Sequence, residues 1–211
     1  MQEDKKTRKA IAIIEILERE GIKLRKQRFT PFQSLVATVL SARTRDVATL
    51  NAAKKLFAKY PNAEDLAKAK PKEVERLIHG VGFYRQKAKR IVKLAKIILR
   101  NYNGITPQRF EDLIKLPGVG KKTAACVLCN AFNKPAICVD THVHRIANLL
   151  ALVNTKTREE TMAELAKILP KKYWCRINSC LVALGQRICK PSKQLCNICP
   201  ISRLCAQQNK I

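Results

Sequence analysis

The sequence of 211 residues has few acidic residues and no long apolar run, and each scarcity excludes a class of protein. Asp and Glu together number 16 against 42 Lys and Arg, which gives a formal net charge of +26. Because the surplus is spread along the whole chain, it predicts a long polyanion as the partner. Uninterrupted apolar stretches such as 124–129 fall far below the ~20 residues that span a bilayer. We therefore expect no transmembrane helix and no membrane partner.

A secretory signal is also not expected near the start of the chain. The basic residues Lys5, Lys6, Arg8 and Lys9 precede a short apolar stretch that is broken at Glu15. No cleavage site follows this stretch, so the pattern is not that of an exported protein. The sequence predicts a cytoplasmic location.

Glycine is scarce at 7 residues, and the apolar residues recur at helical spacing. Segments such as 85–100 and 162–169 have apolar residues three and four apart instead of in alternation, which predicts an almost entirely helical fold. Asn62 and Thr106 are expected to precede helices, and Gly104 to follow one. The expected helices cover 7–20, 31–40, 46–59, 63–69, 72–79, 85–102, 107–115, 121–132, 141–152, 157–169 and 171–187.

Four of the glycines lie in two identical triplets, Gly80-Val81-Gly82 and Gly118-Val119-Gly120. Each triplet is predicted to join two helices by a tight turn. In the second hairpin, backbone N–H groups at the positive end of a basic helix suit a phosphate. A Walker loop is a poor match because only one residue separates the glycines. The alternative is that the glycines only permit close helix packing and the lysines are solvated.

A lysine in the first turn of the second hairpin's helix is also a candidate nucleophile. The helix dipole and a neighbouring lysine favour the neutral amine, whereas a bound phosphate acts in the opposite sense. Spacing alone does not decide between Lys121 and Lys122. Asp140 follows apolar residues and precedes a helix, so it is either an N-cap or a carboxylate that stabilises a developing cation, and the two roles are compatible.

The 9 cysteines are an odd number without an export signal, which favours metal ligation over a disulfide framework. Cys189, Cys196, Cys199 and Cys205 have an x6, x2, x5 spacing that suits an iron–sulfur cubane or a zinc ion. Lys193 is expected near the tip of the first loop, where it would contact phosphate. The remaining cysteines are assigned to the apolar core: Cys126, Cys129, Cys138, Cys175 and Cys180.

Five segments resemble the endonuclease III family of base-excision DNA glycosylases in order and spacing: 40–46, 82–88, 116–124, 139–143 and the cysteine cluster. The resemblance covers nearly the whole chain. It implies an all-α fold of two helical lobes flanking a DNA-binding cleft. Residues 24–134 would form a six-helix barrel with a helix-hairpin-helix, and 1–23 with 135–211 an iron–sulfur cluster domain. The four clustered cysteines would hold a [4Fe-4S] cluster.

The same resemblance implies a bifunctional enzyme in which Lys122 is the nucleophile and Asp140 the acid. It would remove oxidised pyrimidines from duplex DNA and cut at the abasic site by β-elimination through a lysine Schiff base. The expected partner is double-stranded DNA with a damaged base or abasic site, bound by a nucleoid-associated monomer. The alternatives are a mismatch-specific glycosylase and a non-catalytic helix-hairpin-helix module that only binds DNA.

Two residues depart from the pattern of bacterial members of that family. Arg43 stands where a glutamine fills the gap left by the extruded base, and Phe83 stands where a leucine acts as a wedge. A planar guanidinium and an aromatic ring can still fill or stack, so we expect both to contact DNA. For Phe83, ordinary core packing is the alternative.

Overall fold

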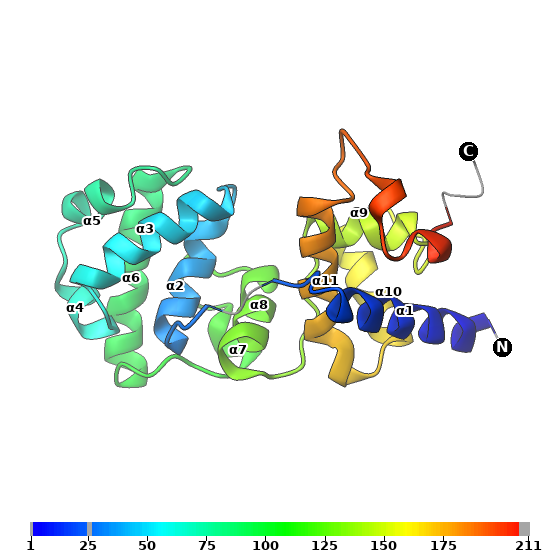
Figure 1. The fold of residues 1–211 in the computed structure, drawn as a ribbon. Helices are drawn as coiled ribbons and strands as arrows, with labels where there is room; N and C mark the ends of the chain where they lie inside the picture. The colour runs from blue at the N-terminus through cyan, green and yellow to red at the C-terminus, as the bar shows by residue number, and fades with distance from the viewer. Residues whose placement is uncertain (1, 25–26, 207–211) are drawn as a thin grey trace. The chain divides into compact units, whose positions relative to one another are not determined.

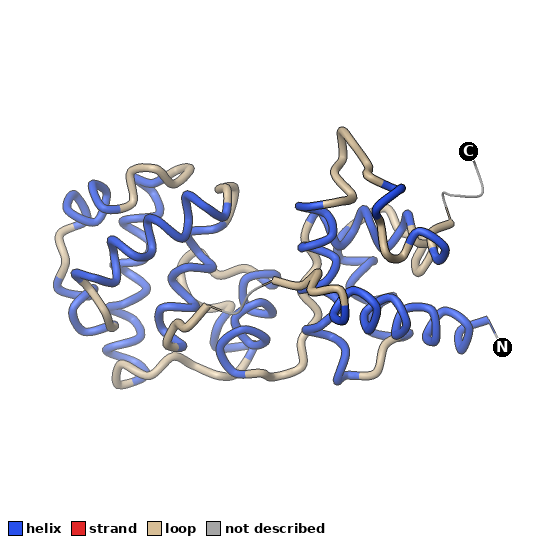
Figure 2. Tube along the Cα trace, in the orientation of Figure 1, coloured by secondary structure: helices blue, strands red, loops and turns tan. Residues whose placement is uncertain are grey.

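The computed structural model describes residues 2–24 and 27–206, and its helices fall into two compact units (Figure 1). The central unit comprises 27–134, and the terminal unit combines 1–26 with 135–211. One isolated β-bridge joins Cys189 and Gln194. Regular structure in the described ranges is helical (Figure 2). This confirms the predicted all-α fold. No helix among these residues is long and apolar enough to cross a membrane.

The central unit is organised around its longest helix. Its helices are α2 (Pro31–Ser41), α3 (Asp46–Lys59), α4 (Ala63–Lys68), α5 (Pro71–Leu77), α6 (Tyr84–Tyr102), α7 (Phe110–Leu113) and α8 (Lys121–Phe132). Helix α6 packs against α2, α4 and α5, and α8 packs against α2 and α7. Ile91, Leu94 and Ile98 recur three and four apart on α6 and are fully buried. The apolar spacing of the sequence thus becomes the core of this unit.

The terminal unit joins the first helix of the chain to the last ones. It contains α1 (Gln2–Arg19), α9 (Thr141–Leu149), α10 (Arg158–Ile168), α11 (Trp174–Arg187) and the short 3₁₀ helices η1 (Lys171–Tyr173), η2 (Cys196–Ile198) and η3 (Ser202–Leu204). Helix α11 packs against both α1 and α9, and α10 contacts α1 and α9. Their apolar faces form one core that includes Ile14, Leu17 and Leu181.

Most predicted helix boundaries are correct to within two residues, and five expectations need correction. The first helix extends back to Gln2, and the segment 171–187 divides into η1 and α11. The segment 107–115 is helical only over Phe110–Leu113. Thr106 is not a cap: its side chain is buried, and its hydroxyl has no hydrogen-bond partner in the described residues.

The fifth correction concerns the end of α9, which stops at Leu149 instead of 152. Ala151 adopts a left-handed conformation with φ 53°. Its N–H donates to the Asn148 carbonyl at 2.9 Å, and the Leu152 N–H donates to the Ala147 carbonyl at 3.0 Å. These are the two bonds of a Schellman motif, which usually has glycine at the left-handed position. Because alanine stands there, the sequence carries no stop signal.

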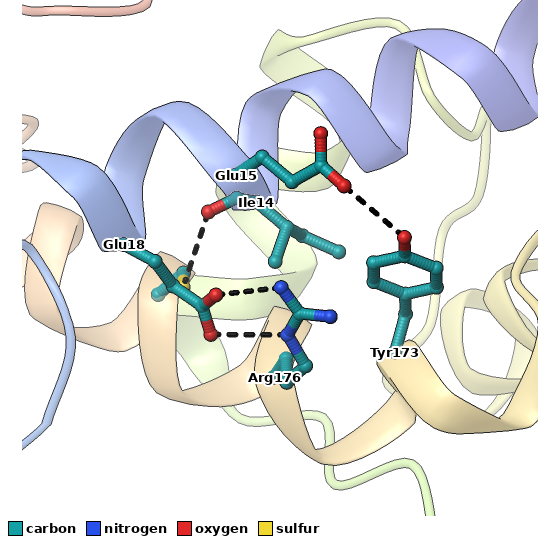
Figure 3. A network of polar contacts seen from close by, with 6 residues as sticks. Ile14, Glu15, Glu18, Tyr173 and Arg176 are labelled. Carbon is teal, nitrogen blue, oxygen red and sulfur yellow. Dashed lines mark hydrogen bonds and ion pairs between the residues drawn. The ribbon is translucent and has the colours of Figure 1, made fainter.

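A polar network fastens α1 to α11 within the terminal unit (Figure 3). The Arg176 guanidinium donates to both carboxylate oxygens of Glu18, at 3.1 and 2.6 Å. The Tyr173 hydroxyl donates to Glu15 at 3.2 Å, and the Arg176 guanidinium lies over the Tyr173 ring. Hydrogen bonding to Arg176 lowers the pKa of Glu18. A two-pronged, partly buried pair of this kind ties the start of the chain to its last long helix.

We expect Arg176→Met to lower the free energy of unfolding by about 1–3 kcal/mol, because it leaves the Glu18 carboxylate partly buried without its donors. Urea unfolding followed by circular dichroism measures the change. Asp4→Asn is the control, since it breaks the exposed Asp4–Arg8 pair on the same helix and should cost about 0.5 kcal/mol or less. Equal effects of the two substitutions would contradict the role given to the Arg176–Glu18 pair.

Candidate functional site

The second glycine triplet forms the turn of a helix hairpin between α7 and α8. Val119 is buried beneath the turn, whereas Gly118 and Gly120 are exposed. Gly118 has φ +83°, a conformation that L side chains rarely adopt, and an added Cβ would lie 3.4 Å from a Val39 methyl group. Gly120 is the N-cap of α8 and provides no side-chain cap. Gly120 therefore offers no side-chain acceptor to the first N–H groups of α8.

Lys121 and Lys122 occupy the first turn of α8, and both are exposed. The first turn contains no acidic residue. Basic side chains therefore stand beside backbone N–H groups at the positive end of a helix. This arrangement is suited to an anion, as the sequence predicted.

The first glycine triplet forms a related but different turn. The N–H groups of Val81 and Val119 donate to carbonyls three residues back, at 2.9 and 3.1 Å, and both valines are buried. The left-handed residue of the first turn is Phe83, with φ 57°, which follows the triplet and precedes α6. In the second turn it is Gly118. The two triplets are identical in sequence, but their turns are therefore only approximately alike in structure.

Arg43 and Phe83 lie side by side in the central unit. The guanidinium carbon of Arg43 is 5.8 Å from the centroid of the Phe83 ring, which is within cation–π range. Phe83 is 57% exposed, so its expected core-packing alternative is wrong. Both side chains are accessible to a ligand; their contact with DNA stays a prediction.

Lys87 is a residue of this region that the sequence analysis missed. It lies in the first turn of α6, is 4% exposed, and donates to the carbonyls of Leu40 and Ala42 and to the Thr44 hydroxyl. Burial, with a smaller contribution from Arg90, lowers its pKa to about 8. Its position in the sequence could have revealed its burial. Lys87 precedes Ile91 and Leu94 by four and seven residues, which places it on the apolar face of the predicted helix.

Asp140 is the N-cap of α9 in the terminal unit. Its Oδ1 accepts a hydrogen bond from the Val143 N–H at 2.9 Å, which confirms the expected capping role. The two histidines that follow have separate surroundings. His142 lies against Gly185 of α11, and His144 Nδ1 is 2.6 Å from the Thr161 hydroxyl. They do not share a site, as predicted from their spacing.

Cys189, Cys196, Cys199 and Cys205 line one cavity of about 140 Å³ in the terminal unit, together with apolar residues such as Leu149 and Ile188. All four thiols are free. Burial raises the pKa of Cys199, and the neighbouring three thiols raise it further. No three His, Cys, Asp or Glu side chains in the described ranges are grouped as ligands of a single ion.

The loop between the first two of these cysteines is closed by backbone contacts. Cys189 and Gln194 form the β-bridge, and the Leu195 N–H donates to the Ile188 carbonyl at 3.1 Å. Arg145 of α9 donates to the Cys189 carbonyl. Lys193 is exposed on this closed loop.

The scattered cysteines require a correction. Four of them are disulfide-bonded, although the sequence analysis disfavoured disulfides: Cys126, Cys129, Cys138 and Cys175. The expected core position is confirmed for Cys129 and Cys138, which are buried, whereas Cys126 and Cys175 are half-buried. Cys180 is free and fully buried, and burial raises its pKa to about 12. Disulfide formation depends on the separation of Cα atoms in space, which cysteine parity does not reveal.

The chain is similar to known proteins of base excision DNA repair. Residues 36–171 match the family described as HhH-GPD superfamily base excision DNA repair protein. The chain is 50% identical to endonuclease III of Thermotoga maritima over 92% of both chains. Two solved structures, a non-covalent endonuclease III–DNA complex and a trapped covalent endonuclease III–DNA intermediate, each match with a TM-score of 0.88, 34% identity and coverage of 97% of both chains.

The titration of Lys87 gives a pH-dependent contribution to stability. Its pKa is about 8 in the folded protein and near 10.5 when exposed, so between these values the unfolded chain binds more protons. The free energy of unfolding should then rise with pH in this window, relative to Lys87→Met. Urea unfolding of both proteins at pH 7.5 and 10 measures the difference. A difference that is independent of pH would contradict the lowered pKa.

Proposed function

The chain belongs to the endonuclease III family of the HhH-GPD superfamily of base excision DNA repair proteins, and from this membership we propose that it excises oxidised pyrimidines from duplex DNA. The chain is a base-excision DNA glycosylase with lyase activity. We infer that it acts as a monomer on chromosomal DNA in the nucleoid, at damaged bases and abasic sites. Its charge of +26 supports binding to a phosphate backbone.

The proposed DNA contacts divide into backbone and base contacts. In the turn formed by Gly118, Val119 and Gly120, the N–H groups of the two exposed glycines would hold one phosphate beside the Lys121 ammonium, while the Val119 N–H donates within the turn. Lys193 would contact a second stretch of backbone from its closed loop. Arg43 and Phe83 would enter the space left by the extruded base, which must leave the stack before its glycosidic bond can be reached.

The proposed reaction begins at the Lys122 amine. In its neutral form Nζ attacks C1′ of the damaged nucleotide, and the bond from C1′ to the base breaks, so that its electron pair leaves with the base. Asp140 would accept the proton released by the amine or stabilise the positive charge that develops on the sugar. The proton released by the amine would pass to O4′ as the C1′–O4′ bond breaks, which opens the sugar and leaves a protonated Schiff base between Lys122 Nζ and C1′. The departing base would take its proton from water.

The Schiff base then allows strand cleavage. Its iminium nitrogen draws electrons and acidifies the C2′ hydrogen. Loss of that proton expels the 3′ phosphate by β-elimination, and water finally hydrolyses the imine to release Lys122. The observation that carries the proposal is the exposed Lys122 in the first turn of α8, in a chain that is half identical to an endonuclease III.

The four clustered cysteines fit a [4Fe-4S] cluster. Four free thiols face one cavity whose other lining is mainly apolar, and thiolates are the usual ligands of such clusters. Cys189, Cys196, Cys199 and Cys205 would each ligate one iron, and the bound cluster supplies a cross-link between the end of α11 and the segments that carry η2 and η3. Lys193 would thereby be held in place for its phosphate.

Lys122→Gln should abolish the covalent adduct that borohydride traps between the protein and a duplex containing thymine glycol. Reduction converts the Schiff base to a stable amine, and gel electrophoresis measures the adduct. Lys121→Gln is the matched control, because it removes the neighbouring charge and should weaken binding while the adduct still forms.

Three other outcomes would contradict the assignment. Loss of the adduct only in Lys121→Gln would move the nucleophile by one residue. Release of the base by the wild type without an adduct would indicate a monofunctional glycosylase. Binding without base release or adduct, on any oxidised pyrimidine, would indicate a module that only binds DNA.

Purified protein should be brown and contain iron and acid-labile sulfide in equal amounts. Cys199→Ser should lose most of both, because a serine hydroxyl is a poor substitute for a thiolate. Cys180→Ser is the control, since Cys180 is free and buried but does not line the cavity. Elemental analysis and visible absorbance measure the difference. A colourless wild type that holds zinc would contradict the cluster.

A further inference from the structure

The exposed pair of Arg43 and Phe83 stands on strained backbone. Both residues have positive φ, 52° and 57° respectively, without being glycine. Such conformations cost on the order of 1 kcal/mol or more each and persist only where the surroundings enforce them. Arg43 and Phe83 are in contact, and each has strained backbone. The surrounding structure therefore holds both side chains in these positions.

Lys87 and Thr44 provide the hydrogen bonds that connect the backbone around Arg43 to the backbone around Phe83. The buried Lys87 ammonium donates to the Leu40 carbonyl at 2.7 Å and also to the Ala42 carbonyl. It therefore binds the backbone at the end of α2, immediately before Arg43. It donates to the Thr44 hydroxyl at 3.0 Å, and the same hydroxyl accepts from the Gly82 N–H at 3.1 Å. The turn carrying Arg43 is therefore bonded to the turn carrying Phe83 through one hydroxyl.

Gly82 allows these two turns to approach closely. A Cβ at residue 82 would lie 2.6 Å from the Arg43 carbonyl oxygen, a separation that real side chains do not show. The glycine of the first triplet is therefore needed for contact between the turns. This close approach accounts for the glycine at position 82, although the left-handed residue of this hairpin is Phe83.

We propose that Lys87 is a positioning residue, which acts through Thr44 and Gly82 to hold Arg43 and Phe83 as one composite wedge that enters the DNA stack as a unit. This inference rests on the proposed function. The guanidinium and the ring would together fill the gap that the extruded base leaves. Because both side chains are already held in place, binding would cost less side-chain conformational entropy. Lys87 itself is buried and does not touch DNA.

The wedge matters only where a base has to be pushed from a paired stack. Unstacking and unpairing cost a few kcal/mol, and less for a base that is already unpaired. We expect Lys87→Met to lower kcat/KM by about tenfold or more on thymine glycol paired with adenine, equivalent to about 1.4 kcal/mol. On the same lesion opposite an abasic analogue, the loss should be less than about threefold, because little unpairing remains.

A second readout reports the wedge directly. With 2-aminopurine as the base opposite the lesion, wild-type binding should raise the fluorescence as that base loses its stacking partner. Lys87→Met should reduce the rise. Lys96→Met is the matched control, since it removes an exposed lysine from the same helix and should leave both the rates and the fluorescence near wild type.

Substitutions at Thr44 test the same link without touching the buried charge. Thr44→Val keeps the shape of the side chain but removes the hydroxyl that joins Lys87 to Gly82, and should reproduce the loss on paired lesions. Thr44→Ser keeps the hydroxyl and should restore the rate. If Lys87→Met fails to fold by circular dichroism, this pair of variants decides the question.

The outcomes separate this inference from the proposed function. Absence of a borohydride adduct in the wild type would overturn the function. An intact adduct with equal losses on paired and unpaired lesions, or with no change in Thr44→Val, would overturn the composite wedge alone.

Discussion

The burial of a single ammonium group is the constraint on which the exposed turns of the central unit depend. Among the described residues, Lys87 is the one lysine or arginine that is buried, in a chain that carries 42 of them. A buried cation is stable only when its donors are all used. The available acceptors are the last carbonyls of α2 and the Thr44 hydroxyl, so satisfying Lys87 fixes the path of the chain between α2 and α3. Arg43 and Phe83 take up their positions as a result.

Helix α11 has the corresponding role in the terminal unit. Its Arg176 holds α1, and its Asn178 donates to the Cys138 carbonyl at 2.7 Å, two residues before Asp140. The first clustered cysteine follows the end of the same helix, where Arg145 of α9 donates to its carbonyl. Asp140 and Cys189 are therefore both positioned next to the same helix.

The fold was largely predictable because helical spacing and caps are local signals. The helices 46–59 and 121–132 were predicted with correct bounds, and Asn62 caps α4 through its side chain as expected. The errors occurred where a distant or unusual interaction prevails. Ala151 ends a helix without glycine, Thr106 is buried instead of capping, and four cysteines are disulfide-bonded by partners that sequence spacing does not reveal.

The sequence by itself determined the helical class, the two glycine hairpins, the capping role of Asp140 and the candidate thiolate cluster. Each of these follows from residue types a few positions apart, and such patterns act through local backbone geometry. Only the tertiary structure decided that four thiols share one cavity, that Arg43 lies over the Phe83 ring and that Lys87 is buried against the end of α2. Those contacts join residues about forty positions apart in the central unit, and partners at that separation are chosen by packing, which residue order does not encode directly.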